Sequence, residues 1–263
     1  MDLQVNNKVY LVAASSKGLG YGIARELAVN GAIVSIASRT KAYIENAAKK
    51  LRSETGTTIH ATVMDASNAE TIEKWIKDVH AAFGRIDGLV VNAGGPPPGN
   101  FDDFTDLQWQ QAFELTLLSA VRMIRGVLPY LRSNGSGSIL TITSISVKEP
   151  IDQLLLSNVF RSGVTSLVKS LANELAEENI RVNNLIPGRI DTERVKALDK
   201  KTAEIKNIPV EKVKEDHEKS IPLGRYGTIN EFGKAGAFLL SPAASYITGA
   251  SLQVDGGILK TVW

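Results

Sequence analysis

The sequence predicts an α/β protein built on one doubly wound parallel sheet. Short apolar runs rich in β-branched residues alternate with longer runs of helical periodicity along the whole chain. A glycine-rich turn separates the first strand-like run from the first helical run. Strands separated by helices of this length require right-handed crossovers, which place helices on both faces of a parallel sheet.

Each predicted element has its own signal. The strands are short β-rich runs, and they span residues 8–13, 32–38, 57–63, 86–92, 138–143, 180–186 and 251–254. The helices carry apolar residues at three- and four-residue spacing, and they span residues 19–30, 42–55, 69–83, 106–131, 152–178 and 229–240. Gly31, Gly56 and Gly84 follow the first three helices, where glycine commonly ends a helix.

Residues 189–222 differ in character from the rest of the chain. They are highly charged, and Pro209 and Pro222 interrupt their helical stretches. We interpret this segment, called the lid below, as a cover over the mouth of a substrate site; the alternative is a solvated pair of surface helices. No linker or repeat divides the chain, so residues 1–263 are expected to form a single domain.

The composition disfavours several classes of function. A net charge of +2 is too small to indicate a nucleic-acid partner. The absence of cysteine excludes thiol chemistry and thiolate metal sites, and it fits a reducing compartment, so we expect a cytoplasmic location. The histidines His60, His80 and His217 share no ligand spacing, so no metal is expected. No apolar run reaches transmembrane length, so no membrane partner is expected.

The turn after the first strand, residues 13–22, reads AASSKGLGYG. Small residues there let backbone N–H groups approach a pyrophosphate, and the following helix adds a favourable dipole. Such turns can also be purely structural, and Ile23 replaces the last glycine of GxGxxG. After the first strand of a parallel sheet, however, the turn predicts a Rossmann-type dinucleotide site. Its expected contacts are Ala14, Ser16, Lys17, Gly18, Leu19 and Gly20.

The end of the second strand indicates which dinucleotide binds. An NAD site usually places an acid there, which accepts hydrogen bonds from the ribose hydroxyls. This chain has Ser38, Arg39 and Thr40 instead, and Lys17 can face the same ribose. Cations and hydroxyls suit the 2′-phosphate of NADP, so we expect NADP rather than NAD. Ordinary exposed charge is the alternative interpretation.

Further motifs follow in a characteristic order. Residues 91–94 read VNAG, residues 138–144 read SILTITS, residues 187–188 read PG, and residues 254–257 read VDGG. With the glycine-rich turn, they resemble the short-chain dehydrogenase/reductase family over essentially the whole chain. The likeness is greatest to 3-oxoacyl-(acyl carrier protein) reductases and related sugar or alcohol dehydrogenases. It implies hydride transfer between a nicotinamide cofactor and a small carbonyl or alcohol substrate.

The resemblance also implies further cofactor contacts. These are Asp65 and Ala66 at the adenine ring, Asn92, Ala93 and Gly94 after the fourth strand, Arg161 at the nicotinamide ribose, and Pro187, Gly188, Ile190 and Thr192 at the nicotinamide end. It implies a homotetramer, or a homodimer, as well. Residues 106–131 and 152–169 are candidates for one interface, and residues 251–254 and 258–263 for another.

The catalytic positions depart from the family pattern of Asn, Ser and Tyr-x-x-x-Lys. Spacing places Thr116 at the Asn position, Ser144 at the Ser position, Ser157 at the Tyr position and Arg161 at the Lys position. The sequence has no tyrosine between Tyr130 and Tyr226 that a shifted alignment could recover. Ser157 and Arg161 are four residues apart, so they share one helix face.

Three interpretations of this altered tetrad remain open. In the first, Ser144 and Ser157 hold the carbonyl oxygen, Arg161 stabilises developing negative charge, and a water delivers the proton. In the second, Lys148, Glu149 or Asp152 serves as the acid. In the third, the protein is a non-catalytic NADP-binding or regulatory module on the same fold. The intact nicotinamide-end segment and the long lid favour an oxidoreductase.

Overall fold

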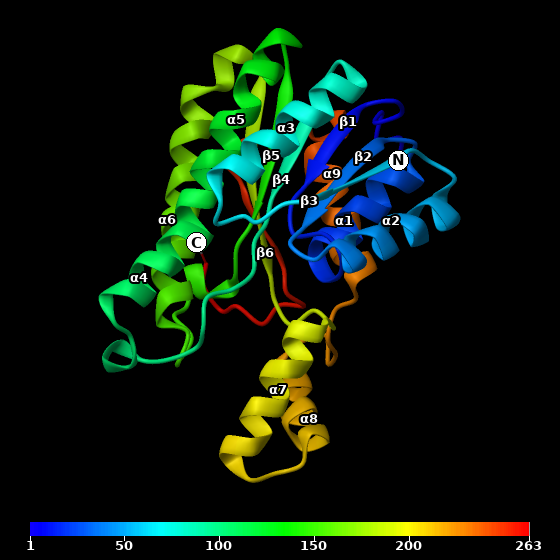
Figure 1. Ribbon diagram of the computed structural model, residues 1–263. Helices are drawn as coiled ribbons and strands as arrows, with labels where there is room; N and C mark the ends of the chain where they lie inside the picture. Colours follow the sequence, from blue (N-terminus) through cyan, green and yellow to red (C-terminus); the bar gives the residue numbers. More distant parts are fainter. Residues whose placement is uncertain (263) are drawn as a thin grey trace.

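Seven strands of residues 1–262, the part of the chain that the computed structural model describes, form one parallel sheet (Figure 1). Their order across the sheet is β3-β2-β1-β4-β5-β6-β7, and all neighbours pair in parallel. The strands are β1 (Val9–Val12), β2 (Ile33–Ser38), β3 (Ile59–Val63), β4 (Gly88–Val91), β5 (Gly137–Ile142), β6 (Ile180–Pro187) and β7 (Ser251–Val254). The predicted doubly wound α/β fold is therefore confirmed.

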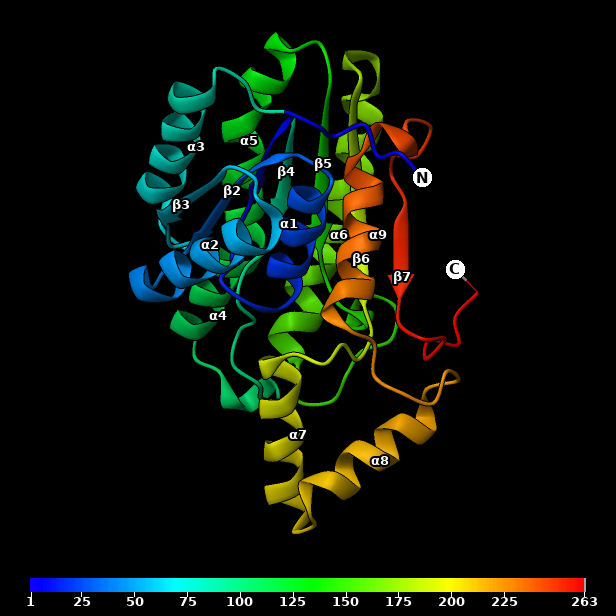
Figure 2. The same ribbon diagram turned by 90° about the vertical axis from the view of Figure 1, so that its right-hand side faces the viewer.

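Helices cover both faces of the sheet (Figure 2). One layer contains α1 (Gly18–Val29), α2 (Lys41–Thr55) and α9 (Ile229–Leu240), and the other contains α3 (Ala69–Phe83), α5 (Ser119–Ser133) and α6 (Leu155–Glu174). Each layer packs against its face of the sheet and forms a separate hydrophobic core. Phe232 and Leu27 are fully buried in the first, and Trp75 and Met123 in the second. Burying each such side chain contributes about 1.5–3 kcal/mol, which holds the strand ends that carry the site.

The helix predicted over residues 106–131 is interrupted. The chain forms α4 (Asp106–Phe113), a π-helical turn at Glu114–Leu118, and then α5, which passes through Pro129 without ending. A π turn inserts one extra residue per turn, which changes the direction in which the following side chains point. Thr116 lies inside this turn and is buried.

The helix predicted over residues 152–178 begins later than expected. Gln153 adopts a left-handed φ of 60°, and Leu154 forms a bridge with Gly99, so α6 starts only at Leu155. At the other end α6 stops at Glu174, and a 3₁₀ turn follows at Ala176–Glu178. The helix nevertheless contains both predicted site positions, Ser157 and Arg161.

The lid contains two helices, α7 (Glu193–Lys206) and α8 (Val210–Ser220), which project beyond the carboxyl edge of the sheet (Figures 1 and 2). Pro209 directly precedes α8, and Pro222 follows it. The strand order reverses between β1 and β4, and at such a switch point a crevice opens at the carboxyl edge of an α/β sheet. The fold therefore places the loops after β1, β4, β5 and β6 around one crevice.

Candidate active site

The turn between β1 and α1 forms a cradle at this crevice. Ala14 has a φ of 47° and Gly18 a φ of 65°, so the turn passes twice through the left-handed region. A Cβ on Gly20 would lie 2.9 Å from Ala14 O, so only glycine permits this close approach. Lys17 caps α1 without a side-chain hydrogen bond. The N–H groups and the positive end of α1 therefore face the crevice, an arrangement that fits a pyrophosphate.

Residues from three loops meet at this cradle. Asn92 Nδ2 donates to Ala14 O at 3.2 Å, which ties the loop after β4 to the phosphate turn. The methyl group of Thr192 lies 3.8 Å from the position of a Cβ built on Gly18. A Cβ on Gly94 would meet nothing within 4 Å, so the loop stays open beside the crevice. The segments predicted to contact the two ends of a dinucleotide are thus neighbours.

The end of β2 lacks an acid and carries a buried hydroxyl. Ser38 Oγ is buried and has no hydrogen-bond partner among residues 1–262. Arg39, Thr40 and Lys17 are exposed. An unpartnered buried hydroxyl beside exposed cations fits a bound group that carries acceptor oxygens. This arrangement fits the 2′-phosphate of NADP.

Asp65 lies after β3, beside the buried Ala66. Its Oδ1 accepts hydrogen bonds from Ser67 N at 3.0 Å and Ser67 Oγ at 2.8 Å, so Ser67 fixes the carboxylate. The resemblance placed Asp65 and Ala66 at the adenine ring. Their position after β3, next to β2 in the sheet, puts them on the same side of the switch point as Ser38.

Arg161 is held at the carboxyl end of β5. Its Nε–H donates to Ser157 Oγ at 3.2 Å, and its Nη1 donates to Ile142 O at 3.0 Å and Thr143 O at 3.2 Å. Burial, with the positive charge of Arg194, lowers the pKa of Arg161 to about 10. The guanidinium therefore remains a cation at neutral pH, and all three of its acceptors are neutral.

Ser144 directly follows Thr143, whose carbonyl accepts from Arg161. Its Oγ accepts a hydrogen bond from Ser146 N at 3.1 Å and so caps a short 3₁₀ turn at Ile145–Val147. Ser157 is 9% exposed on α6. In both serines the hydroxyl oxygen accepts a hydrogen bond, and the O–H of each is left to donate to another group.

The three alternative acids follow Ser144. Glu149 and Asp152 are exposed, Lys148 is half-buried, and Glu149 Oε1 accepts a hydrogen bond from Lys260 N at 3.2 Å. The Lys260 contact directs the Glu149 carboxylate toward the C-terminal segment.

Thr116 faces a small cavity from the π turn. The cavity has a volume of about 10 Å³ and is lined by Asn92, Thr116, Arg161 and other residues. Thr116 Oγ1 is buried and has no partner among residues 1–262. A cavity of this size, with a few polar groups among mostly apolar walls, is close to what one water needs. The structure thus places Thr116 and Arg161 on the walls of one cavity.

The segment after β6 approaches the sheet closely. Gly188 N donates to Val254 O at 3.0 Å, and a Cβ on Gly188 would lie 2.5 Å from Asp255 Cα, so glycine is required there. Ile190 is buried and bridges to Gly227. Thr192 Oγ1 accepts from Val195 N at 3.3 Å and caps α7.

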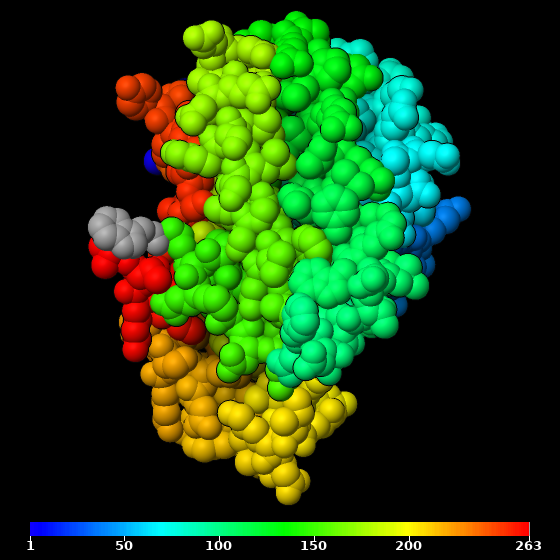
Figure 3. All heavy atoms as spheres, turned by 90° about the vertical axis from the view of Figure 1, so that its left-hand side faces the viewer, coloured from blue at the N-terminus to red at the C-terminus, as the bar shows by residue number. Residues whose placement is uncertain are grey.

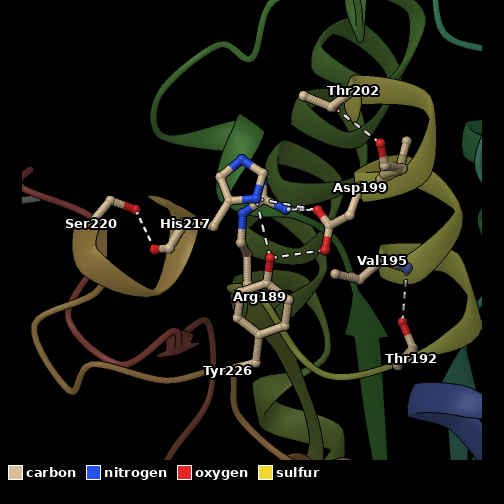
Figure 4. Close-up of polar contacts among 9 residues, drawn as sticks. Arg189, Thr192, Val195, Asp199, Thr202, His217, Ser220 and Tyr226 are labelled. Atoms are coloured by element: carbon tan, nitrogen blue, oxygen red, sulfur yellow. Dashed lines mark hydrogen bonds and ion pairs between the residues drawn. The ribbon is translucent and has the colours of Figure 1, made fainter. Parts of the chain in front are cut away.

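A partly buried polar network fixes the base of the lid (Figure 4). Arg189 Nη1 donates to Asp199 Oδ1 at 2.9 Å, and Tyr226 OH donates to Asp199 Oδ2 at 2.9 Å. His217 Nε2 lies 2.9 Å from Arg189 Nη2, and its Nδ1 lies 3.1 Å from Tyr226 OH. Burial lowers the pKa of His217, and the charge of Arg189 lowers it further, while Asp199 opposes both. Asp199 lies on α7 and His217 on α8, whereas Arg189 precedes the two helices and Tyr226 follows them.

A larger cavity of about 850 Å³ lies between α7 and α8, and its walls include Asp199, Ala203, Pro209 and Tyr226. It contains none of the predicted catalytic residues.

Among residues 1–262, no group of three or more His, Cys, Asp or Glu side chains is arranged to hold a metal ion. None of the described helices combines the length and apolar character needed to cross a bilayer.

Comparison with known sequences identifies the family. The family profile described as enoyl-(acyl carrier protein) reductase matches residues 13–259. Dehydrogenase/reductase SDR family member 4 of Oryctolagus cuniculus is 36% identical over 252 residues, which cover 95% of this chain and 93% of that protein. This chain belongs to the short-chain dehydrogenase/reductase family. As a member, it is an NAD(P)-dependent oxidoreductase.

Solved structures extend the likeness of this short-chain dehydrogenase/reductase. L-sorbose reductase from Gluconobacter frateurii, complexed with NADPH and L-sorbose, has a TM-score of 0.95 and 30% identity, and all of both chains is covered. An NADPH-bound short chain oxidoreductase from Pseudomonas aeruginosa PAO1, described as containing an atypical catalytic center, has a TM-score of 0.86 and 27% identity. That comparison covers 98% of this chain and all of the other.

Sequence reasoning missed two sets of contacts made by the lid of this short-chain dehydrogenase/reductase. One is the lid network, although Asp199 carries a signal: with Val195, Leu198 and Thr202 it follows the three- and four-residue spacing of a packed helix face. The other is Arg194, whose side chain lies against Gly95. Nothing in the local sequence distinguishes Arg194 from other exposed charges of the lid.

Proposed function

We propose that this short-chain dehydrogenase/reductase reduces a carbonyl group with NADPH by using Ser144, Ser157 and Arg161 in place of the usual Tyr and Lys. The observation that carries the proposal is the fixed guanidinium of Arg161. It lies one turn from Ser157 and contacts the carbonyl of Thr143, which precedes Ser144, and its acceptors among residues 1–262 are all neutral. A preorganised cation near a carbonyl oxygen stabilises the negative charge that develops there.

The two serines can orient the carbonyl oxygen. Each accepts a hydrogen bond from a neighbouring N–H, Ser144 from Ser146 N and Ser157 from Arg161 Nε. The hydroxyl hydrogens of Ser144 and Ser157 are then free to donate to the substrate. Neither serine is acidic enough to give up its proton outright.

The proton would come from a water held beside Arg161. The cavity of about 10 Å³ is bordered by Asn92 and Arg161, and the unpartnered Thr116 Oγ1 opens into it. That hydroxyl and the Arg161 guanidinium provide the polar partners that an ordered water needs. Thr116 and Arg161 would therefore position the water and stabilise the charge left on it.

NADPH supplies the hydride when it is bound. The first part of the chain would hold its phosphates and adenosine through Ala14, Ser16, Lys17, Gly18, Leu19, Gly20, Ser38, Arg39, Thr40, Asp65 and Ala66. The later part would hold its nicotinamide end through Asn92, Ala93, Gly94, Arg161, Pro187, Gly188, Ile190 and Thr192. The preference for NADPH over NADH rests on the exposed cations and the buried Ser38 hydroxyl after β2, where no acid stands.

We propose that residues 189–222 act as the lid of a single domain that spans residues 1–263. Its two helices project beyond the carboxyl edge of the sheet (Figure 1). Arg189 and Tyr226, which flank the lid helices in sequence, are both anchored to Asp199 of α7. Such an anchor would let the helices move as a unit over the crevice.

We also propose a homotetramer in the cytoplasm. One face, formed by α4, α5 and α6, is broad and continuous (Figure 3). It leaves Phe113 38% and Val159 46% exposed. The second interface would use β7, where Leu252 is 38% exposed, together with residues 258–262; Trp263 lies outside the described residues. Exposed apolar surface of this kind favours association, and a chain without cysteine fits a reducing compartment.

The test is NADPH oxidation against a panel of aldehydes, ketones and oxo acids. The proposal expects turnover of at least one carbonyl and a loss of that turnover in Ser144→Ala. NADPH binding without turnover of any compound would favour a non-catalytic, cofactor-binding role instead.

A further inference from the structure

Arg194 is an exposed cation at the mouth of the crevice. It lies on the first turn of α7, two residues after Thr192. Its Nη2 is 3.2 Å from the position of a Cβ built on Gly95, so the side chain reaches across from the lid to the loop after β4. No carboxylate of residues 1–262 lies within 4.0 Å of its guanidinium nitrogens.

Most other arginines of the chain have a protein partner. Carboxylates hold Arg25, Arg85, Arg132, Arg189 and Arg225. Backbone carbonyls hold Arg52, Arg122, Arg161 and Arg181. Arg39, Arg125 and Arg194 have no such partner among residues 1–262; Arg125 lies on α5, whereas Arg39 and Arg194 follow strand ends at the carboxyl edge of the sheet.

The charges around the crevice favour an anion between its two arginines. The positive charge of Arg194 is close enough to contribute to the lowered pKa of Arg161. Repulsion between the two cations therefore disfavours the charged form of each guanidinium. The carboxylates that closely precede Arg194 in the chain, Asp191 and Glu193, both pair with Lys196. A bound oxyanion would relieve the repulsion and complete the hydrogen bonding of Arg194.

We propose that the substrate is an oxo acid, with its carboxylate bound by Arg194 while Ser144 and Ser157 hold its carbonyl oxygen. This inference rests on the proposed carbonyl-reductase function and names its substrate class. A cofactor diphosphate is the other oxyanion that could reach the crevice. The cradle at Gly18 and Gly20 already offers N–H groups to that diphosphate, whereas the guanidinium of Arg194 lies against Gly95 in the loop after β4.

The first experiment measures binding without turnover. With NADP⁺ bound the carbonyl cannot be reduced, so calorimetric titration of acetoacetate, 3-oxohexanoate and their methyl esters reports recognition alone. We expect each acid to bind about tenfold or more tightly than its ester. Arg194→Ala should remove that difference, Arg194→Lys should keep part of it, and Lys201→Ala, which removes an exposed charge from the same helix, should keep all of it.

Two results would overturn the inference. The first is equal binding of acid and ester by the parent. The second is an acid preference that survives in Arg194→Ala. If NADPH also binds tenfold more weakly to that variant, the result would assign Arg194 to the cofactor diphosphate. If the parent binds the acids more tightly than the esters but does not reduce the acids with NADPH, the carboxylate site at Arg194 would be supported. The proposed reductase activity would then be overturned.

Discussion

Arg161 donates from Nε to Ser157 Oγ at 3.2 Å, one helical turn earlier on α6. The same guanidinium donates from Nη1 to the carbonyls of Ile142 and Thr143 at the end of β5. The cation is therefore fixed to both the helix and the strand, and it orients the serine that stands at the tyrosine position. The proposed binding of the cofactor by Arg161 and the proposed action of Ser144 on the substrate oxygen can be tested by separate mutations.

Arg161→Ala should weaken NADPH binding clearly. Removing a charge-assisted hydrogen bond to the nicotinamide ribose reduces affinity by about 1.5–3 kcal/mol, which is roughly ten- to hundredfold in Kd. Fluorescence titration of NADPH with the parent and the variant measures this change directly.

Ser144→Ala is the matched comparison. In the proposed site its hydroxyl acts on the substrate oxygen, so NADPH binding should stay within about twofold while kcat falls by about tenfold or more. If both variants leave cofactor binding and turnover untouched, this assignment of the site is wrong.

Arg39→Asp should reverse the cofactor preference. The parent should bind NADPH more tightly than NADH, because Arg39 and Lys17 are free to pair with the 2′-phosphate. An aspartate there repels that phosphate and accepts hydrogen bonds from the ribose hydroxyls of NADH. Dissociation constants for both cofactors measure the effect, with Lys49→Asp, an exposed charge reversal on α2, as the control. Equal affinities of the parent for the two cofactors would contradict the prediction.

The sequence predicts those parts of the site that depend on local pattern. Alternating strands and helices with a glycine-rich turn specify the parallel sheet, and the order of strand ends then brings Gly18, Asn92 and Thr192 together. The four-residue spacing of Ser157 and Arg161 specifies a shared helix face, which their hydrogen bond shows. Hydrophobic periodicity and the spacing between motif residues are properties of the local sequence, so they can be recognised before the fold is known.

The features that were missed depend on distant contacts. Helical periodicity continues through Glu114–Leu118, so it does not show that the turn there is π-helical. The lid network joins Arg189, Asp199, His217 and Tyr226 from four separate segments. No spacing rule relates four such segments, because the backbone path of the lid decides which of them meet.

His217 makes the stability of the protein depend on pH. Burial and Arg189 lower its pKa in the folded state, whereas Asp199 opposes them, and the cation of Lys206 adds slightly to the lowering. The unfolded chain therefore takes up a proton first, near its usual pKa of about 6.5, and stability falls as the pH drops from there toward the folded pKa. Urea unfolding between about pH 7.5 and 5 measures this loss.

His217→Gln serves as the control, because glutamine keeps hydrogen-bonding groups but does not titrate. Its unfolding free energy should fall less steeply over the same pH range. Some dependence should persist, because burial also lowers the pKa of His60. Identical pH profiles for the parent and His217→Gln would show that this histidine does not titrate differently in the folded state.

Val159→Asp should disrupt the proposed interface on α6. Val159 is 46% exposed beside Phe160, which packs against Trp109 with ring centroids 5.7 Å apart. Placing a carboxylate in an apolar interface leaves a buried charge without a partner, which is strongly unfavourable. Sedimentation velocity at micromolar concentration should show a tetramer for the parent and smaller species for the variant. A parent that sediments only as a monomer would contradict the assembly.

Ser157→Tyr combined with Arg161→Lys restores the family pattern and tests the altered tetrad most directly. A tyrosine hydroxyl has a pKa near 10 that an adjacent lysine lowers, so it can donate the proton that serine cannot. If the parent is a modified reductase, the double variant should reduce simple carbonyls faster with NADPH. Each single variant is the control, since neither alone supplies both the acid and the cation of the usual pair.

Folding must be checked first, because tyrosine is much larger than the 9%-exposed Ser157 that it replaces. Circular dichroism and NADPH titration show whether the double variant retains its fold and its cofactor site. A folded, NADPH-binding double variant that reduces carbonyls no faster than the parent would mean that proton delivery does not limit the parent reaction. If neither the parent nor the double variant turns over a carbonyl while both bind NADPH, the result would favour the non-catalytic, cofactor-binding role.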